Sequence, residues 1–581
     1  MKRLQKLKPK VKIQNDFYVL DTETGYKKKG KIHYSFIGQP EGFIFGAIVG
    51  NNFTKVFHDL EELKKELLDE RYKGKKVFAH NAEYDLNTIY GNIYNMDPTA
   101  IFNGKFIKAT NGNCEFADSL NILGAAVKRI GAMMGKEKQE LGSHKMVSKM
   151  VNGLPPAKDI NYCIRDCEIV WEALLMMFEE ASDIKITQAS LSLTYYRRFH
   201  QPFTIEHNEN TKYFWNSYYG GRTECFKIGA THARIIDVNS MYPDRMRNEV
   251  FPNPKYLKKN MYVKPADFIR RYLPDFEGCV QMKVKHKPIW IGYLPVKIEG
   301  KLCFPTGVFE GCWNFNEVRY ALDAGVIEIL SIEYVVYSQR MDSPFVSYID
   351  ELYDKRYSVQ DLFHIYRIKI YMNSLYGKFA QKIQTEAIYL DNIANHIDLI
   401  QEHQKAGTFI KLDVFNALRP DAFLIVKTNK NYSLNYSIPS FASYITSGAR
   451  IKLLDQLVKM ESKVPVYCDT DSIAFEVETF FPDTKQLGAW SMEEKIITEV
   501  RGLKNYSYIS GDKIENKIKG VPRKAKQLSK NTFQYNSVMK TKEALRRQMD
   551  PGKEVIRTKI LTNKYTKRVV LNNGQTKPIE L

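Results

Sequence analysis

The sequence predicts a multidomain protein of mixed α/β and α+β class. Its 581 residues are too many for one hydrophobic core, so several domains are expected. Residues 1–180 alternate strand-like and helix-like segments, which is typical of an α/β domain. The middle of the chain is punctuated by proline and glycine, and a helical region and a basic tail come after it.

In the N-terminal part, the pattern of apolar residues predicts two strands and two helices. Residues 16–24 and 42–50 are strand-like. Residues 60–72 and 159–181 carry apolar residues at helical spacing, and the second of these helices has acidic residues near its start.

The remaining elements follow in chain order. Proline and glycine predict loop-rich stretches at 252–256 and 288–311, and residues 345–383 have a helical pattern. The spacer at 384–426 combines apolar residues at near-helical spacing with the strand-like TFIKLDVF, so we expect it to fold as a small subdomain. An apolar, strand-like run at 464–475 follows it.

The charge of the chain favours a polyanionic partner. The formal net charge is +20, and residues 512–581 alone hold 18 Lys and Arg against 6 Asp and Glu. Nucleic acid is the first candidate for such a partner. A generally solvated basic surface is the alternative.

Composition limits the class of protein further. A hydrophobic fraction of 44% and an aromatic fraction of 13% fit a globular chain. The 8 cysteines form no CxxC pair, so we expect neither zinc nor a disulfide framework. The basic N-terminus has no apolar segment behind it, and the longest apolar runs are too short for a bilayer. We therefore expect a cytoplasmic protein without a signal peptide or a membrane partner.

Two acidic residues interrupt the apolar run at 464–475. Asp469 and Asp471 lie in YCDTDS, and residues two apart on a β-strand point to the same face. Neighbouring carboxylates repel each other unless one is protonated or a divalent cation binds both. The fragment alone leaves a second interpretation open, in which Asp-Thr-Asp-Ser is the turn of a β-hairpin.

A second group of carboxylates lies in the N-terminal part. Asp21 and Glu23 share one face of the first strand. Asp85 follows in HNAEYDL, and Asp166 lies on the second helix with Tyr162 one turn before it. Four acids from three separate elements can bind two metal ions that activate a water for phosphodiester hydrolysis. Tyr162 could orient that water.

A third element adds an acid to the pair in YCDTDS. Asp237 ends the strand of IIDVNSMYPDRM, and with Asp469 and Asp471 it forms a second set that could bind two metals. Between them lies KIYMNSLYGKFA, in which Lys369 and Asn373 share a helical face. A lysine there can neutralise phosphate charge.

The N-terminal set resembles the three exonuclease motifs of the DnaQ-like 3′–5′ proofreading domain, which has an RNase H-like fold. An aromatic or apolar platform for the strand suits any base. The single-strand contacts that the resemblance implies are Thr24, Asn81, Tyr84, Ser119 and Leu120. It also aligns Lys138, in KQEL, with a lysine that contacts the scissile phosphate, although a solvated charge is the alternative there.

The second set resembles motifs A, B and C of family B DNA polymerases, which here are DVNSMYP, KIYMNSLYG and YCDTDS in the family's order. The resemblance implies a right-hand polymerase with palm, fingers and thumb, in which one metal activates the primer 3′-hydroxyl and the other holds the triphosphate. It implies two Mg²⁺ ions per active site, with Mn²⁺ as a substitute. The implied metal-binding positions are Asp237, Val238, Asp469 and Asp471 in one site, and Asp21, Glu23, Asp85 and Asp166 in the other.

The same resemblance assigns contacts to the incoming nucleotide. Tyr242 would stack under the sugar and exclude a 2′-hydroxyl, while Lys369 would face the triphosphate. Asn373 and Tyr376 would flank the sugar and base. Arg356, in YDKRYS, would be a second phosphate contact or a solvated arginine.

Three shorter matches imply contacts to the DNA. YYGGR resembles the Tyr-x-Gly-Gly motif between the exonuclease and polymerase domains, and its glycines let the backbone approach the template. TSGAR and KNY resemble template- and primer-binding motifs. The DNA-binding residues that these matches imply are Tyr218, Gly220, Gly221, Arg222, Thr446, Arg450, Lys504 and Tyr506.

The spacing of the motifs resembles the protein-primed subgroup from phages, adenoviruses and linear plasmids. Its first insertion helps to hold the priming protein, and its second closes a ring around the duplex. The resemblance implies a processive, strand-displacing monomer whose partners are primer–template DNA, dNTPs, a terminal protein and a single-stranded DNA-binding protein. A nucleic-acid-primed family B polymerase is the alternative, and a stand-alone nuclease is a third.

The resemblance also implies domain boundaries. The expected domains are an exonuclease domain at 1–190, a palm at 191–252 and 427–515, insertions at 253–340 and 384–426, fingers at 341–383, and a thumb at 516–581.

Overall fold

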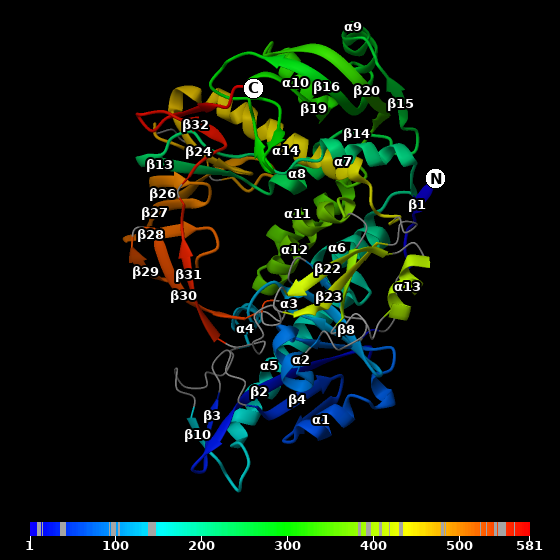
Figure 1. The fold of residues 1–581 in the computed structure, drawn as a ribbon, viewed down its shortest axis with the longest axis vertical. Coiled ribbons are helices and arrows are strands. Elements are labelled where there is room, and N and C mark those ends of the chain that lie inside the picture. The colour runs from blue at the N-terminus through cyan, green and yellow to red at the C-terminus, as the bar shows by residue number, and fades with distance from the viewer. Residues whose placement is uncertain are drawn as a thin grey trace.

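The structure is a computed structural model in which an N-terminal α/β domain, a pair of long helices and a large antiparallel sheet follow one another along the long axis of the molecule (Figure 1). It describes residues 1–581 apart from 9–12, 14, 35–41, 92, 94–99, 103–104, 137–146, 382–384, 391–396, 406–408, 417–418, 429–433, 478–480, 483, 523, 530, 540–542, 544–553 and 563.

The N-terminal domain is built on a nine-stranded mixed sheet. Its central strand β2 (Phe17–Lys28) pairs with β4 (Phe43–Gly50) in antiparallel and with β6 (Lys76–Ala79) in parallel orientation, and β6 continues in parallel to β9 (Cys114–Asp118). The other strands are β3 (Lys31–Tyr34), β5 (Phe53–Phe57), β7 (Ala100–Phe102), β8 (Lys105–Asn111) and β10 (Val147–Lys149). β1 (Lys2–Leu4) pairs separately with β11 (Ile205–His207).

Helices cover this sheet because its central strands are apolar on both faces. The longest helix, α5 (Ala157–Ala181), packs on β2 and β4 through buried residues spaced three and four apart, including Cys163, Val170 and Met177. The others are α1 (Leu60–Glu66), α2 (Ala82–Tyr90), α3 (Leu120–Leu123) and α4 (Val127–Met133). The predicted α/β character of this part is confirmed.

The large sheet in the other half is antiparallel and has seven strands. Its strands in spatial order are β12 (Thr223–Cys225), β24 (Pro465–Asp469), β25 (Ser472–Phe475), β13 (Gly229–Val238), β26 (Trp490–Gly502), β27 (Asn505–Ser510) and β28 (Lys513–Ile518). Helix α14 (Pro439–Lys459) packs on this sheet, because Leu453 and Leu457 share a buried cluster with Ile236 and Ile473. Helix α8 (Met241–Asn248) follows β13 directly.

The middle of the chain is more ordered than its proline and glycine content predicts. A five-stranded sheet is formed by β14 (Phe251–Pro252), β15 (Lys258–Met261), β16 (Phe276–His286), β19 (Gly307–Asn314) and β20 (Ile327–Met341). Between them lie α9 (Pro265–Asp267), α10 (Phe315–Asp323) and the hairpin β17 (Val296–Ile298) with β18 (Lys301–Cys303). The loop-rich prediction was incomplete here because strand pairing over long sequence separations stabilises the sheet.

Two helices connect the halves of the molecule. α11 (Val346–Ser358) and α12 (Leu362–Phe379) confirm the helical pattern at 345–383. α12 packs on α6 (Gln188–Tyr195), and the Tyr371 hydroxyl donates to the Met177 carbonyl of α5 at 2.9 Å. The short α7 (Phe214–Ser217) leads into the seven-stranded sheet.

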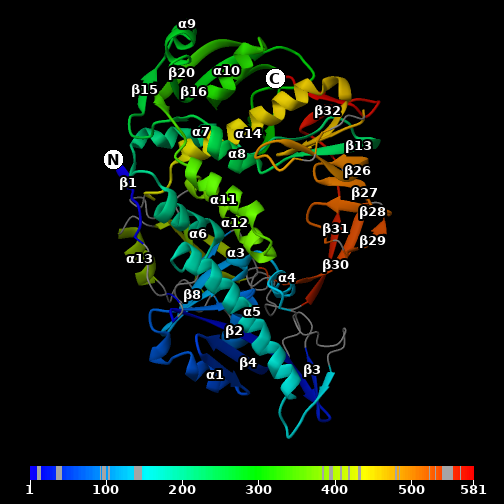
Figure 2. The same ribbon diagram turned by 180° about the vertical axis from the view of Figure 1, so that it is seen from behind.

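The spacer and the tail form two small sheets. β21 (Thr385–Leu390), β22 (Phe409–Asn416) and β23 (Arg419–Thr428) accompany α13 (Ile397–Lys405), so the predicted subdomain is present. β29 (Lys526–Ser529), β30 (Thr532–Val538) and β31 (Glu554–Ile560) form the second sheet, beside the seven-stranded sheet in Figures 1 and 2. The last strands, β32 (Arg568–Val570) and β33 (Thr576–Pro578), leave it and return to residues 224–228. The expected thumb at 516–581 is therefore not one structural unit.

Candidate active sites

The acidic pair of YCDTDS lies at the tip of a β-hairpin. β24 ends at Asp469 and β25 begins at Ser472, which pairs back with Asp469. Thr470, in the turn, has a φ of 64°, as tight hairpin turns require. The expectation that both acids share a face of one strand is wrong, and the alternative of a hairpin turn describes the backbone.

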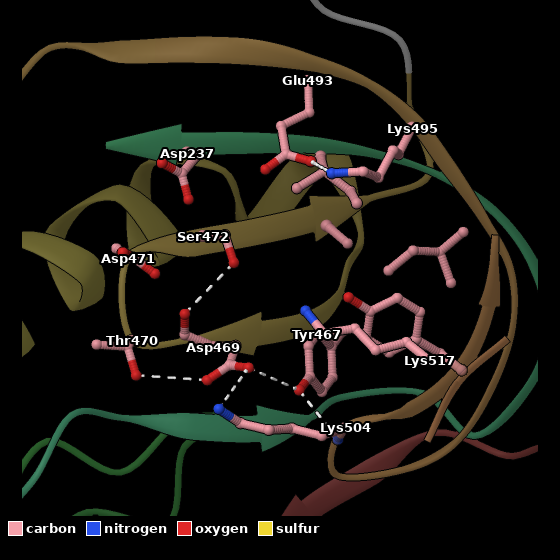
Figure 3. A pocket seen from close by; sticks show the side chains of 14 residues that line it. Asp237, Tyr467, Asp469, Thr470, Asp471, Ser472, Glu493, Lys495, Lys504 and Lys517 are labelled. Atoms are coloured by element: carbon pink, nitrogen blue, oxygen red, sulfur yellow. Dashed lines mark hydrogen bonds and ion pairs between the residues drawn. The ribbon is translucent and has the colours of Figure 1, made fainter. Parts of the chain in front are cut away.

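A neighbouring strand supplies the third acid. Asp237, near the end of β13, pairs with Ser472, and the Val238 backbone N–H donates to the Asp471 carbonyl at 2.9 Å. Asp237, Asp469 and Asp471 thus line the same cavity, which Figure 3 shows from close by. The pairing of β13 with β25 brings Asp237 beside acids that are more than 200 residues away in the chain.

The carboxyl groups of this site are hard to ionise together. Burial, aided by the charges of Asp471 and Glu493, raises the pKa of Asp237 to about 7. Burial and the charge of Asp469 raise the pKa of Asp471 to about 6. A divalent cation would relieve this repulsion, and carboxylate oxygens are the ligands that Mg²⁺ prefers. The donor set therefore fits the predicted metal ions.

The cavity around these acids, about 390 Å³ in volume, is also lined by cations. The Lys504 ammonium lies 3.3 Å from a carboxylate oxygen of Asp469, and Lys495 pairs with Glu493 at 2.9 Å (Figure 3). Lys517 completes the basic lining. Sequence reasoning missed Glu493, Lys495 and Lys517, because charged residues on a strand form no motif until the sheet places them.

Two aromatic rings lie between the sheet and the helical pair. The ring of Tyr242, on α8, stacks on that of Tyr376, on α12, with centroids 4.4 Å apart and planes at 30°. Both rings are half-buried. The two predicted nucleotide contacts therefore support each other across two elements.

Three cations gather beside these rings. Burial, Arg356 and Arg129 all lower the pKa of Lys369, because each disfavours another positive charge. Arg356 donates to the Ser240 hydroxyl at 3.0 Å, and Asn373 is exposed and donates to the Lys369 carbonyl at 2.9 Å. Such a cluster suits a polyanion such as a triphosphate. The motif did not include Arg129, which lies on α4.

The N-terminal carboxylates form a second site on the other sheet. Asp21 and Glu23 share a face of β2, and their oxygens and the Cys163 sulfur lie within 4.8 Å of one another. Asp85, on α2, accepts hydrogen bonds from the Thr22 backbone N–H at 3.0 Å and hydroxyl at 2.8 Å. Burial and Asp21 raise the pKa of Asp85 despite these bonds. The prediction of two acids on one face of the first strand is confirmed.

Helix α5 completes this set. Burial raises the pKa of the Cys167 thiol to about 11, and the carboxylates of Asp21, Asp166 and Asp85 add to the shift. The charges of all three acids therefore reach Cys167 on α5, and carboxylates gathered in this way offer a donor set that fits divalent cations. Tyr162 is half-buried one turn before Asp166. Cys163 escaped the sequence reasoning, because a lone cysteine carries no ligand spacing.

Comparison with known proteins decides the family. Residues 136–458, more than half of the chain, match the family model described as DNA polymerase type B, organellar and viral. The protein is a family B DNA polymerase of this type. The predicted resemblance to family B is confirmed.

Curated relatives carry the same description of activity. The polymerase is 27% identical over 530 residues to the DNA-directed DNA polymerase of Enterobacteria phage PRD1, which covers 86% of this chain and 84% of the relative. It is 30% identical over 291 residues to a probable DNA polymerase of Neurospora intermedia, covering 48% of this chain and 29% of that protein.

The fold is similar to that of Phi29 DNA polymerase. A structure of that enzyme with primer–template DNA and incoming nucleotides covers 95% of this chain and 100% of its own, with a TM-score of 0.69 and 18% identity. The likeness extends to its structure with single-stranded DNA, with a TM-score of 0.61 and 17% identity. Within the described parts of the polymerase, every helix is too short or too polar to cross a membrane.

Arg222 is not a surface contact for DNA in the polymerase. Its side chain is 0% exposed and forms an ion pair with Glu224, which is itself fully buried and paired with Arg568 at 3.2 Å. It also donates to the Gly292 carbonyl at 2.9 Å and lies over the Phe304 ring. The prediction of DNA binding by Arg222 is wrong, because this arginine joins the large sheet to the middle of the chain.

The glycines beside it differ in their surroundings. A Cβ at Gly221 would lie 2.7 Å from the Thr470 side chain, so Gly221 lets its loop pack on the hairpin of β24 and β25. The Thr470 backbone N–H also donates to the Arg222 carbonyl at 2.7 Å. A Cβ at Gly220 would meet open space, and Tyr218 is half-buried beside Trp215, so both stay predicted DNA contacts.

The residues of TSGAR are buried in α14. Thr446 is 2% exposed and donates to the Ser443 carbonyl at 3.1 Å. Arg450 is 3% exposed, pairs with Glu317 at 2.8 Å and donates to the Tyr219 carbonyl at 2.7 Å. Neither side chain faces solvent, so the expected DNA contacts are corrected to structural roles. Arg450 holds the loop before Arg222, and Thr446 bonds within α14.

Lys504 and Tyr506 of KNY line the cavity around Asp237, Asp469 and Asp471. Lys504 lies in the turn before β27 with a φ of 52°, so the expected alternation with Tyr506 along one strand is wrong. Tyr506 is largely buried, and the Lys517 ammonium lies 5.5 Å from its ring centroid. Both residues nevertheless border the cavity that contains Asp469.

The predicted single-strand contacts surround the second site. The Thr24 and Tyr84 hydroxyls share a hydrogen bond. Asn81 precedes α2 with a φ of 73°, and its backbone N–H donates to an Asp118 carboxylate oxygen at 2.9 Å. Asp118 also accepts a hydrogen bond from the Leu120 backbone N–H at 2.9 Å. This acid, which the sequence did not predict, therefore holds the starts of α2 and α3 together.

The two residues of the serine-leucine motif differ in exposure, because Ser119 is buried and Leu120 is exposed. Ser119 is fully buried and hydrogen-bonds His80 at 2.9 Å and the Ala79 carbonyl at 3.2 Å, so its side chain does not face a strand. The expected contact from Ser119 is corrected to a structural role. Leu120 is 37% exposed and stays a predicted contact. Lys138 lies outside the described residues.

Proposed function

We propose that this polymerase replicates a viral or linear mobile genome, proofreads with a separate 3′–5′ exonuclease site, and starts synthesis from a terminal protein. One observation carries the first two parts of this proposal. A single family B chain presents two carboxylate sets on two different sheets, each of which fits divalent cations.

In the polymerisation site, Asp237, Asp469 and Asp471 would hold two Mg²⁺ ions. When bound, these ions lower the pKa of the primer 3′-hydroxyl and stabilise the pyrophosphate that leaves. Lys504, beside Asp469, offsets part of the acidic charge and lies where a primer phosphate would pass. The hairpin keeps the acids at fixed positions, so little reorganisation is needed during the reaction.

The nucleotide would enter between the sheet and the helices α8 and α12. Lys369 and Arg356 would neutralise the triphosphate, and the clustering that lowers the pKa of Lys369 supports this. The sugar would lie on Tyr242, whose ring is braced by Tyr376. A braced ring can exclude a 2′-hydroxyl by steric contact, whereas a mobile ring would move aside.

In the exonuclease site, Asp21, Glu23, Asp85 and Asp166 would hold the metal pair that activates water against the terminal phosphodiester. Tyr162 would orient that water. Thr24, Asn81, Tyr84 and Leu120 would hold the frayed 3′ end. The order β5–β4–β2–β6–β9, antiparallel and then parallel, supports an RNase H-like domain at 1–190.

The limits of the other proposed domains follow the sheets and helices and differ from those expected from the sequence. The seven-stranded sheet would be the palm, α11 and α12 the fingers, and the β29–β31 sheet the thumb. The sheets at 253–340 and 384–426 would be the two insertions of the protein-primed subgroup. Residues 565–581 return to the palm and are assigned to it, because Tyr565 donates to the Cys225 backbone and Arg568 pairs with Glu224.

Separation of the two activities tests the two-site proposal. Asp469→Ala should abolish primer extension and leave degradation of single-stranded DNA intact. Asp21→Ala combined with Asp166→Ala should do the reverse, since each site uses its own carboxylates. Loss of both activities from either folded variant would show that the sites are not independent.

The priming mode needs its own test. A small basic protein encoded beside this polymerase, mixed with it, one dNTP and Mg²⁺, should form a covalent protein–dNMP adduct. The Asp469→Ala variant is the control and should form none. If the wild-type enzyme extends DNA primers but never labels such a protein, the nucleic-acid-primed alternative replaces this part of the proposal.

A further inference from the structure

Strand β2 continues well past the exonuclease carboxylates into an arm of three strands. The arm consists of residues 24–28 of β2, all of β3, and β10. Figures 1 and 2 both place β3 and β10 at one end of the molecule, on the same side as the β29–β31 sheet.

The register of the arm places like residues in rows. Tyr26 pairs with His33, and His33 pairs with Val147. Lys28 pairs with Lys31, which pairs with Lys149. Residues two apart on a strand share a face, so the aromatic row and the lysine row lie on the same face.

This face meets the predicted path of the single strand at Thr24, on the side of β2 opposite to Asp21 and Glu23. Thr24, bonded to the Tyr84 hydroxyl, lies two residues before Tyr26 and therefore on the same face. Two residues of a strand span about 7 Å, roughly the reach of one extended nucleotide. The aromatic row follows Thr24 at that distance, and the lysine row lies another such step beyond.

The opposite face of the arm is packed against the domain. Ile32 and Tyr34 are buried, and the Tyr34 hydroxyl donates to the Asp159 carboxylate of α5 at 2.7 Å. Asp159 is itself fully buried. The arm therefore holds a fixed orientation, with its aromatic and basic rows toward solvent.

The exposed rows have the properties of a nucleic-acid platform. The Tyr26 and His33 rings are stacked, with centroids 4.6 Å apart and planes at 3°, and Tyr26 is 41% exposed. Lys28, Lys31 and Lys149 are exposed, and within the described part of the chain none of them forms an ion pair. An open aromatic surface beside unpaired cations is how sequence-tolerant single-strand binding works.

We propose that the arm is a single-stranded DNA site that extends the exonuclease cleft upstream of the terminal nucleotide. A base would stack on the Tyr26–His33 pair while the three lysines contact the next phosphates. A duplex does not fit this role as well, because its bases are already stacked and their faces are covered. The inference rests on the proposed exonuclease function and adds the length of strand that this site recognises.

Substrate length provides the test. Two oligonucleotides with the same 3′ sequence, of about 3 and about 12 nucleotides, bracket the reach of the arm. For Tyr26→Ala with His33→Ala, the ratio of kcat/KM on the long over the short substrate should fall about tenfold, mainly through KM. Lys28→Ala with Lys31→Ala should lower the same ratio and flatten its salt dependence. An unchanged ratio in both variants would overturn the proposal.

Controls separate the arm from general effects. Lys65→Ala with Lys73→Ala removes two exposed lysines from elsewhere in the same domain and should leave the ratio unaltered. Tyr26→Phe keeps the ring and should behave as wild type. Thermal unfolding midpoints identify any variant that fails to fold. If the aromatic variants fail to fold, the lysine variants still test the proposal.

Direct binding distinguishes failure of the arm from failure of the exonuclease proposal. In the Asp21→Ala, Asp166→Ala background, fluorescence anisotropy with a labelled dodecanucleotide should show weaker binding for the arm variants, and a blunt duplex should show a smaller loss. If the wild-type enzyme degrades no DNA but the arm variants still lose single-strand binding, only the exonuclease assignment fails. An equal loss on duplex, or none on single strands, contradicts the arm itself.

Discussion

At the scale of single residues, the site is dominated by carboxylates that are costly to ionise without a cation. Asp237 is the clearest case, because burial and two neighbouring acids raise its pKa to about 7. An acid whose folded pKa lies above its unfolded value adds stability below the unfolded pKa and loses it as pH rises through the folded one. In the metal-free protein, the stability that protonated Asp237 contributes is therefore lost between about pH 4 and pH 7.

The pH window predicts a stabilising substitution. In EDTA, Asp237→Asn should raise the free energy of unfolding at pH 8 by about 1 kcal/mol or more, and by much less at pH 4. Mg²⁺ should stabilise the wild type more at pH 8 than at pH 5, and Asp237→Asn should weaken that effect. Urea unfolding at both pH values measures the difference. A substitution that destabilises equally at both pH values would contradict the electrostatic explanation.

Sugar selection is the second prediction at residue scale. Tyr242→Val should increase ribonucleotide incorporation about tenfold or more, with little loss for deoxynucleotides, because the braced ring no longer meets the 2′-hydroxyl. Single-turnover addition of matched rNTP and dNTP measures the ratio. Tyr242→Phe keeps the ring and is the control. If discrimination survives in Tyr242→Val, the steric gate lies on another residue.

At the scale of elements, the described residues of the spacer at 384–426 form a small unit of three strands and one helix. Its sheet is antiparallel in the order β21–β23–β22, so sequence neighbours β22 and β23 form a hairpin. Such a unit can be replaced without cutting a strand of the seven-stranded sheet.

Replacement of this unit should remove strand displacement and processive synthesis but not the addition of single nucleotides. With residues 384–426 exchanged for a short Gly/Ser loop, addition of one nucleotide to a primed template should stay nearly intact. Copying through a duplex, and long products from one binding event, should fail, because an open enzyme neither retains the duplex nor separates the strands. Primer extension with a competitor trap measures this, on templates with and without a downstream strand. Long strand displacement by the deletion variant under these conditions would refute the ring assignment.

At the scale of the whole molecule, one continuous core joins the N-terminal α/β domain to the helical pair and to α14. Tyr366 of α12 donates to the Leu123 carbonyl at 2.6 Å, and the Tyr348 hydroxyl donates to the Tyr371 carbonyl at 2.8 Å. The proposed fingers therefore rest directly on the N-terminal α/β domain. The β29–β31 sheet stands apart from this core, as expected of an element that grips DNA (Figure 1).

The basic tail should bind duplex phosphates without reading sequence. Lys524→Gln with Lys526→Gln, both exposed, should weaken DNA binding alike on unrelated sequences. The slope of log affinity against log salt should fall by roughly one unit per lost contact. Lys65→Gln with Lys73→Gln is the matched control. A loss confined to some sequences, or an unchanged slope, contradicts this role. Arg523 and Lys530 belong to the same predicted surface but lie outside the described residues.

The amino-acid sequence by itself determined the family, and it supplied the carboxylates that we propose for both sites. The motifs around Asp21, Asp237 and Asp469 are short, and each of them folds locally into a strand end, a turn or a helix. Helix and strand periodicity also located α5, α12 and the folded spacer, because these patterns depend on neighbours within a few residues.

Only the tertiary structure decided which motif residues are buried and which remain accessible. Arg222 and Arg450 are basic residues in DNA-binding motifs, yet both are buried because their acidic partners and carbonyl acceptors arrive from distant strands and helices. Tertiary contacts also decided three other features. These are the pairing of Asp469 with Ser472, the sheet at 253–340 and the return of residues 565–581 to the seven-stranded sheet. A buried charge is tolerable only when its partners are in place, and those partners are set by long-range packing that no local pattern encodes.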